Sequence, residues 1–223
     1  MKDVSNTRAA IAQSLGVSNT EIYSTGLALI KKFQTSGPIL DFGAGKGHFL
    51  QMLEGQSFLD CTGADLMDRP ADIPASNQWI QADLNHRLPV ADETYDVIMA
   101  IEVIEHLENP RATAREWRRI LKPNGLLIFS TPNNESWRAL IALFVRGHFV
   151  SFLEKDYPAH ITALTRLDIT RILQENAFNH AGFFYTTKGL VPGLKGVTWQ
   201  QLSMGLCRGR RFSDNIFTVA RKV

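Results

Sequence analysis

The chain has 223 residues, of which 44% are hydrophobic and 21% charged, a composition that fits one well-packed soluble domain. Its 24 basic and 22 acidic residues leave a formal net charge of +2, which gives no general case for nucleic-acid binding. The first residues lack the apolar core of a secretion signal, and the apolar run 140–145 is too short to span a bilayer, so we expect a cytoplasmic protein.

Residues 3–35 are predicted to be helical and to precede a sheet. Apolar residues supply a buried face along this segment, and the stretch 16–20 interrupts it. Ser18 or Asn19 could cap the second helix, because both side chains accept hydrogen bonds from free N–H groups at a helix start. We therefore assign residues 1–36 to an N-terminal helical segment and residues 37–223 to the main domain.

A strand, a glycine turn and a helix follow at residues 38–50. A short apolar run predicts a buried strand that ends at Asp41, and glycines occupy alternate positions as Gly43, Gly45 and Gly47. The helical pattern begins at His48. Glycine lets the backbone turn sharply and lets a ligand approach without a Cβ in the way. Strand, turn and helix in this order predict the first unit of a doubly wound α/β sheet.

Three more strands are predicted before residue 102. The stretch 58–65 ends in Asp65, the stretch 77–83 ends in Asp83, and 94–101 is the continuous apolar run of a central parallel strand. One carboxylate can accept hydrogen bonds from both hydroxyls of a ribose. An acid about 20 residues beyond the glycine turn is where an α/β nucleoside site places it, which predicts this function for Asp65.

Strands and helices continue to alternate in the second half of the chain. A helix should begin at Asn109-Pro110, since proline is well tolerated at the first helical position. We expect it to end near residue 121 and to be followed by a strand at 126–132, a helix at 166–176, and strands at 178–187 and 215–220. The fold class is therefore α/β, with a Rossmann-like sheet.

Several of these stretches together resemble the class I S-adenosylmethionine-dependent methyltransferases of the small-molecule type, including the ubiquinone-biosynthesis (type 11) group. They are the D-x-G-x-G-x-G pattern from Asp41 to Gly47, the segment EVIEHL at 102–107, and LKPNG at 121–125 before the next strand. The resemblance covers roughly residues 37–180. It implies a seven-stranded, mostly parallel sheet with helices on both faces and an antiparallel last strand. It also implies S-adenosyl-L-methionine as the cofactor.

The resemblance assigns cofactor contacts to the ends of the strands. In such enzymes the second acid binds the ribose, the third strand end holds the adenine, and the end of the fourth strand lines the methionine part. A carboxylate at the first strand end suits the ammonium and sulfonium groups of this cofactor. The residues so implied are Asp41, Gly43, Gly45, Gly47, Asp65, Leu66, Asp83, Leu84 and Ile101. The alternative is an ordinary glycine turn in an unrelated α/β fold.

Two histidines are candidates for catalysis. His106 follows the fourth strand and is the first candidate for a general base, although it could instead orient a loop. His160 is the second candidate, or a hydrogen-bonded loop residue. The apolar stretch around 134–160 corresponds to a lid-like insertion over the acceptor, or to a core or dimer-packing helix. Likewise, residues 1–36 could close over the cofactor or only pack on the sheet.

We therefore expect methyl transfer to a small-molecule or lipid/sugar-precursor acceptor, with oxygen as the methylated atom. Base-amine enzymes of the family carry Asn/Asp-Pro-Pro-aromatic where this chain has Glu102-Val-Ile-Glu105, which argues against a nucleobase amine. The basic stretch 189–213 could favour an acidic substrate or a membrane surface, or be a solvated loop. Cys61 and Cys207 have no metal-binding spacing, and we expect no metal.

Three rival interpretations remain. A nicotinamide-dependent oxidoreductase is disfavoured by His48, which replaces the third glycine of its fingerprint, and by the acid at Asp41. A non-catalytic partner-binding protein with a methyltransferase fold is disfavoured by the intact acids at the strand ends. A protein or RNA substrate is disfavoured by the near-neutral charge and the apolar insertion. The sequence leaves the acceptor and the oligomeric state open.

Overall fold

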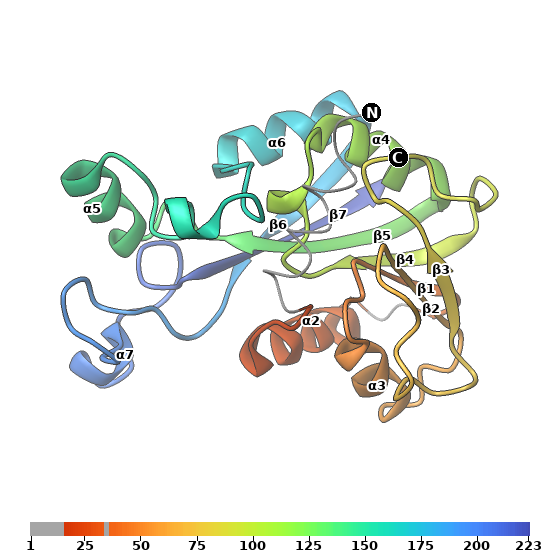
Figure 1. Ribbon diagram of the computed structural model, residues 1–223, viewed down its shortest axis with the longest axis horizontal. Helices are drawn as coiled ribbons and strands as arrows, with labels where there is room; N and C mark the ends of the chain where they lie inside the picture. The colour runs from red at the N-terminus through yellow and green to blue at the C-terminus, as the bar shows by residue number, and fades with distance from the viewer. Residues whose placement is uncertain (1–15, 34–35) are drawn as a thin grey trace.

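The computed structural model describes residues 16–33 and 36–223, and the helix expected within residues 3–15 lies outside them. Seven strands form one sheet in the order β3-β2-β1-β4-β5-β7-β6 (Figure 1). The strands are β1 (Ile39–Phe42), β2 (Cys61–Asp65), β3 (Gln78–Gln81), β4 (Tyr95–Ala100), β5 (Leu121–Pro132), β6 (Phe178–Tyr185) and β7 (Asn215–Lys222).

The direction of the strands matches the predicted topology. β1 pairs in parallel with β2 and β4, β2 with β3, and β4 with β5. β7 pairs antiparallel with both β5 and β6. The fold prediction is therefore confirmed, including the antiparallel last strand.

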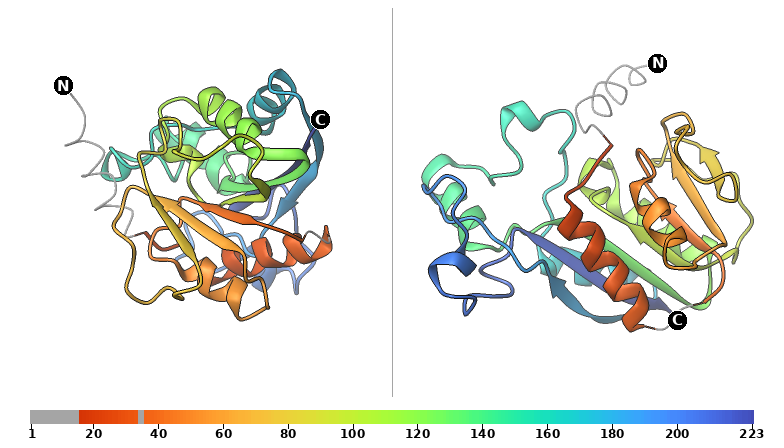
Figure 2. Two further views of the ribbon diagram at one scale, coloured as in Figure 1. Left: turned by 90° about the vertical axis from the view of Figure 1, so that its right-hand side faces the viewer. Right: turned by 90° about the horizontal axis from the view of Figure 1, so that it is seen from below.

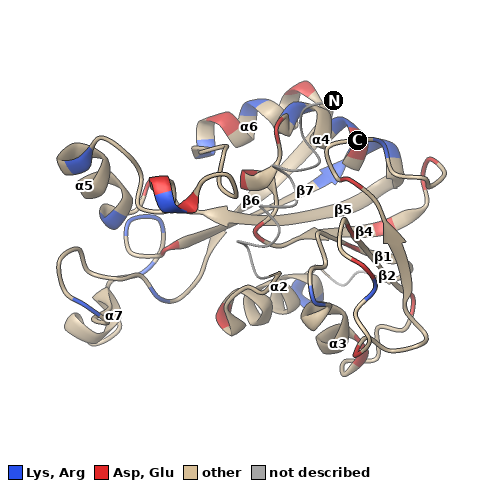
Figure 3. Cartoon of the chain, viewed as in Figure 1, with Lys and Arg blue, Asp and Glu red and all other residues tan. Residues whose placement is uncertain are grey.

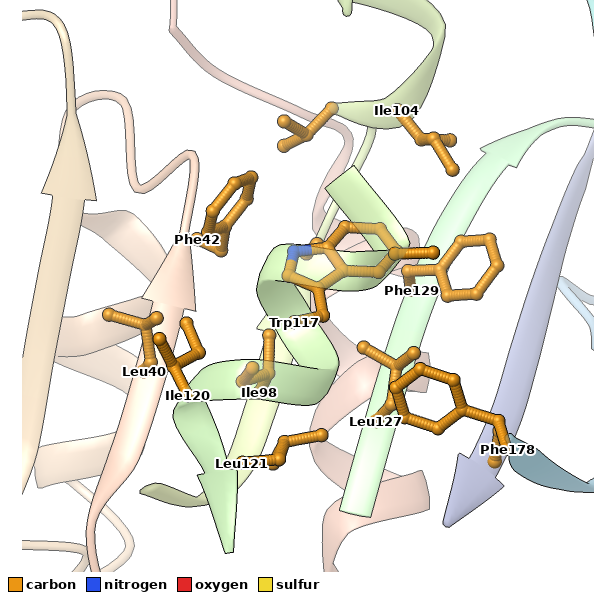
Figure 4. Packing of buried hydrophobic residues seen from close by; sticks show 14 of the residues in the cluster. Leu40, Phe42, Ile98, Ile104, Trp117, Ile120, Leu121, Leu127, Phe129 and Phe178 are labelled. Atoms are coloured by element: carbon orange, nitrogen blue, oxygen red, sulfur yellow. The ribbon is translucent and has the colours of Figure 1, made fainter. Parts of the chain in front are cut away.

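Helices cover both faces of the sheet. α2 (Thr20–Lys32) and α3 (His48–Glu54) lie on one face, and α4 (Pro110–Ile120) and α6 (Arg166–Glu175) lie on the other (Figure 1). Each face has its own buried apolar cluster. On the α4 face, the ring of Trp117 lies 5.6 Å from that of Phe42 and 5.2 Å from that of Phe129 (Figure 4). Burial of such large rings is a main source of the free energy that holds the helix to the sheet.

The helix starts follow the capping residues in the sequence. The side chain of Asn19 accepts a hydrogen bond from the main chain of Glu21, so Asn19 is the cap of α2 and Ser18 is not. Asn109 caps α4 in the same way through Ala112, with Pro110 as the first helical residue.

One strand begins earlier than the sequence pattern indicates. β5 starts at Leu121 rather than at 126, because Leu121 already pairs with Tyr95. The register then shifts, so that Val97 pairs with Leu126 and the residues between are accommodated as an irregularity. Asn124 adopts a left-handed backbone there, with φ of 61°, as an asparagine can.

Two short helices project beyond the sheet, at the end where β5 and β6 finish. They are α5 (Trp137–Arg146) and α7 (Trp199–Leu202), seen on the left of Figure 1 and again in Figure 2. Two 3-10 turns complete the elements, η1 (Ile104–His106) and η2 (Glu154–Asp156). Among the described residues, every helix is too short or too polar to cross a membrane.

Candidate active site

A cavity of about 450 Å³ opens at the carboxyl ends of the central strands. It lies where the strand order reverses between β1 and β4, which is where open α/β sheets bind their ligands. It brings together eight of the nine predicted cofactor residues, both candidate histidines and a stretch of the N-terminal segment. The exception is Gly47, which caps α3 with φ of 74° and does not line the cavity.

The glycine turn is shaped by close packing. A Cβ on Gly43 would lie 2.3 Å from Cγ2 of Val103, and a Cβ on Gly45 would lie 2.4 Å from the main-chain oxygen of Gly16. Both glycines also have positive φ, at 86° and 51°. The turn therefore requires glycine for two reasons, the backbone conformation and the lack of space.

Asp41, at the end of β1, has a buried carboxylate with an unused acceptor. Its side chain is 2% exposed, and its Oδ2 atom has no hydrogen-bond partner among the described residues. Burial, with a smaller effect from the charge of Asp65, raises the pKa of Asp41 to about 8. A buried, unpaired carboxylate on a cavity wall fits a ligand that carries a positive charge.

Asp65, at the end of β2, is fixed by main-chain donors. Its Oδ2 accepts from the N–H of Gly45 at 2.8 Å, and its Oδ1 accepts from the N–H of Met67 at 2.9 Å. Each oxygen keeps a lone pair for a further donor. Asp83 is also held in place, because its Oδ1 accepts from the main chain and the side chain of Asn85 at 2.9 and 3.1 Å.

Residues 16–19 form a strap, a name we use for this stretch, that runs against the glycine turn and lines the cavity. The N–H of Lys46 donates to the oxygen of Gly16 at 3.0 Å, and the N–H of Ser18 donates to the hydroxyl of Tyr23 at 2.8 Å. The break at 16–20 was the only sequence signal for the strap. The sequence did not predict that Tyr23 lines the cavity, because its position there depends on how α2 packs on the sheet.

The two histidines come from distant segments and meet at the same wall. His106 ends η1, just after β4, and its Nδ1 lies 2.7 Å from the oxygen of Ala159. His160 lies in the loop before α6, and its Nδ1 lies 2.5 Å from the oxygen of Ser151. The ring centroids are 4.8 Å apart. Since a carbonyl can only accept, both Nδ1 atoms carry the proton, and burial lowers the pKa of both rings.

Two glutamates near the histidines were missed as site residues. Glu102 lines the cavity, has φ of 54°, and accepts hydrogen bonds from Ser130 at 3.1 Å and Asn215 at 2.9 Å. Glu105 is fully buried, and neither of its carboxylate oxygens has a partner among the described residues. Burial raises the pKa of both carboxyls. In the sequence, residues 102–105 argue only against a nucleobase amine, because nothing in this stretch indicates that the carboxyl of Glu105 is buried.

The cavity wall is acidic. Asp41, Asp65, Asp83 and Glu102 all line it, and within the described ranges 16–33 and 36–223 no lysine or arginine does. Such a wall favours cationic groups. Together with the glycine turn and the strand order, these acids form the arrangement that the sequence analysis expects of a class I methyltransferase.

Comparison with known proteins gives the family. A family model described as a methyltransferase domain matches residues 19–180, which is most of the chain. The chain therefore belongs to this methyltransferase family. The match confirms the predicted class, a class I S-adenosylmethionine-dependent methyltransferase, and with it the predicted cofactor.

The similar proteins are distant in sequence. The chain is 23% identical over 152 residues to a ubiquinone biosynthesis O-methyltransferase of Aliivibrio fischeri (strain MJ11), which covers 65% of this chain. The chain spans only 64% of the length of that relative. Its fold resembles a SAM-dependent methyltransferase from Archaeoglobus fulgidus, with a TM-score of 0.65, 17% identity, and 94% and 97% of the two chains covered. A Mesorhizobium loti methyltransferase gives a TM-score of 0.64 at 16% identity, covering 92% and 99%.

Proposed function

We propose that this protein is an enzyme that transfers a methyl group from S-adenosylmethionine to a hydroxyl oxygen of a small-molecule or lipid/sugar-precursor acceptor. The observation that carries the proposal is the cavity that joins the unpaired carboxylate of Asp41 to the pair of histidines. It offers a site for a cation and a site for a nucleophile within one space. Family membership and the O-methyltransferase name of the relative support the same reaction.

The acids at the strand ends are assigned to the cofactor. When bound, S-adenosylmethionine supplies an electrophilic methyl group on a positively charged sulfur. Asp41 provides the negative charge for the cationic part, and Asp65 has the free lone pairs that two ribose hydroxyls need. Asp83 and Leu84 are assigned to the adenine, and Ile101 to the methionine part. The strap closes this side of the cavity.

The histidines are assigned to the acceptor. A hydroxyl is a poor nucleophile until its proton is removed, so a group that assists this removal accelerates the transfer. Both histidines carry their proton on Nδ1, which leaves the lone pair of Nε2 available. His106 is the first candidate for this assistance and His160 the second, in the same order as in the sequence analysis.

The projecting helices favour an apolar acceptor. Residues 134–160, which we propose as the lid, include Phe144 at 92% exposure, and the chain after α7 includes Met204 at 92%. Both helices leave the sheet at the end where the cavity lies (Figure 2). α5 has Arg138 in its first turn and Arg146 in its last (Figure 3). An acceptor with an apolar chain, or with an anionic group beside it, would suit this surface.

The test has a binding part and a turnover part. Calorimetry with S-adenosylhomocysteine should show one site per chain, and a screen of quinol precursors, sugars and lipid-linked intermediates should yield a product methylated on oxygen. His106→Ala should then lower turnover more than His160→Ala, with S-adenosylhomocysteine binding retained in both. Tight binding with no turnover on any acceptor would favour a non-catalytic protein. A cytoplasmic location stays a sequence-based prediction.

A further inference from the structure

Glu105, His106 and His160 form a compact group of ligand atoms. One carboxylate oxygen and one ring nitrogen from each histidine all lie within 4.8 Å of one another. Two of the residues come from η1, at the end of β4, and the third comes from a loop more than fifty residues later in the chain. This group was not visible in the sequence, which predicted no metal.

The two segments are tied together by their main chains. The oxygen of Glu105 accepts from the N–H groups of Ile161 and Thr162 at 2.9 and 3.0 Å, and His106 reaches the oxygen of Ala159. Because these bonds flank His160 on both sides, its position next to η1 is built into the fold. The main chain therefore holds the three residues of the group close together.

The carboxylate of Glu105 has no other role that its contacts reveal. It is 0% exposed, and both its oxygens lack hydrogen-bond partners within residues 16–33 and 36–223. The main-chain N–H of Glu105 and the hydroxyl of Thr131 act to lower the pKa of this carboxyl but complete no hydrogen bond to its oxygens within those residues. A buried carboxyl in this state is unfavourable, because it has lost its hydration. A cation held between its oxygens and the histidines would remove this cost.

The histidines are oriented as metal ligands usually are. Each donates its Nδ1 proton to a main-chain carbonyl, which fixes the tautomer and leaves Nε2 as the nitrogen with the lone pair. A ligating histidine characteristically makes this hydrogen bond with its other ring nitrogen.

We propose that Glu105, His106 and His160 bind one divalent first-row transition-metal ion, such as Zn²⁺ or Mn²⁺. Two imidazole nitrogens and one carboxylate oxygen are a donor set that suits these ions and leaves coordination positions open. Both histidines line the cavity, so the open positions face the space proposed for the acceptor. In the part of the chain that the structure describes, the wall has carboxylates and no lysine or arginine, which also favours a cation.

The chemical role of the ion rests on the proposed methyl transfer, whereas its binding does not. An acceptor hydroxyl bound to the ion would have a lower pKa and release its proton to solvent. The oxygen would then form a bond to the methyl carbon as the carbon–sulfur bond breaks, and the sulfur would leave as a neutral thioether. In this arrangement the histidines act through the ion, and His106 does not itself take the proton.

The proposal is tested on the full-length protein after removal of metals with a chelator and of any affinity tag. Zn²⁺ and Co²⁺ are titrated in competition with a chromophoric chelator, and the visible absorption of bound Co²⁺ reports its ligands. We expect one ion per chain. Glu105→Gln and His160→Ala should each weaken binding at least about 100-fold, since even the groups that support metal ligands contribute 10- to 100-fold. His148→Ala, which changes a histidine outside the group, should leave the affinity unchanged.

The experiment can distinguish failure of the proposed metal site from failure of the proposed function. Each variant is also titrated with S-adenosylhomocysteine, and retained binding shows that it is folded. If Glu105→Gln does not fold, His160→Ala decides alone. Ion binding by the wild type without methyl transfer would uphold the site and refute the function. Methyl transfer that survives complete metal removal would overturn the catalytic role of the ion. Absence of ion binding, or an equal loss of affinity in His148→Ala, would overturn the site itself.

Discussion

Replacing Asp65 with alanine should nearly abolish nucleoside binding. The carboxylate is already aligned by two main-chain donors, at 2.8 Å to Oδ2 and 2.9 Å to Oδ1, so it meets a ribose without rearrangement. Hydrogen bonds that involve a charged group contribute roughly 1.5–3 kcal/mol each. Two such bonds to the ribose hydroxyls amount to at least about 3 kcal/mol, which weakens binding by at least about 100-fold.

The measurement is calorimetric titration with S-adenosylhomocysteine, combined with thermal unfolding. Asp65→Asn should give an intermediate loss, since it keeps one oxygen but places an amide against a main-chain N–H. Asp68→Ala is the matched control, because Asp68 is an exposed carboxylate three residues further on that bonds Gln81 at 2.7 Å outside the cavity. The assignment of the cavity would be refuted if the affinities of Asp65→Ala and Asp68→Ala for the nucleoside both stayed within about threefold of the wild-type affinity. A threefold change corresponds to about 0.7 kcal/mol, which is too little for the loss of two such hydrogen bonds.

Two further predictions concern the same turn. The pKa of Asp41 is raised from 3.8 to about 8, so the folded apoprotein binds a proton more tightly than the unfolded chain, and its stability should fall as pH rises from about 4 to 8. Asp41→Asn should flatten this dependence in thermal unfolding. Nucleoside binding near neutral pH should release a proton, seen as a dependence of the calorimetric enthalpy on the buffer. Gly43→Ala should lower the free energy of unfolding by about 1–3 kcal/mol more than Gly147→Ala does. Both glycines have positive φ, but only at Gly43 would the new Cβ lie against Val103. Equal losses for the two variants in chemical denaturation would contradict this prediction.

The features that were predicted correctly are local in the sequence. Asp41, Asp65 and Asp83 each lie at the end of a predicted strand, so they could be assigned without knowing how the strands pair. Parallel pairing then brings the strand ends to one edge of the sheet. The same reasoning placed His106, since it follows β4 within one short turn.

The features that were missed depend on contacts between distant segments. A main-chain hydrogen bond from Lys46 to Gly16 joins the strap to the turn, and nothing in either stretch alone indicates that partner. Glu105 resembles any other polar residue of a loop until the fold shows it to be fully buried. The early start of β5 was missed because Pro123 and Gly125 normally end a strand, whereas here they lie in a register shift.

The position of β7 has a consequence for the biogenesis of the protein. β6 has β7 as its neighbour in the sheet, and β7 leaves the ribosome after all the other strands of that sheet. Until residues 215–222 emerge, β6 has no strand to pair with and β5 has an open edge on that side. The sheet is therefore completed only when residues 215–222 have emerged, by closing the long excursion 133–214. Loss of β7 by premature termination would deprive the sheet of two strands rather than one.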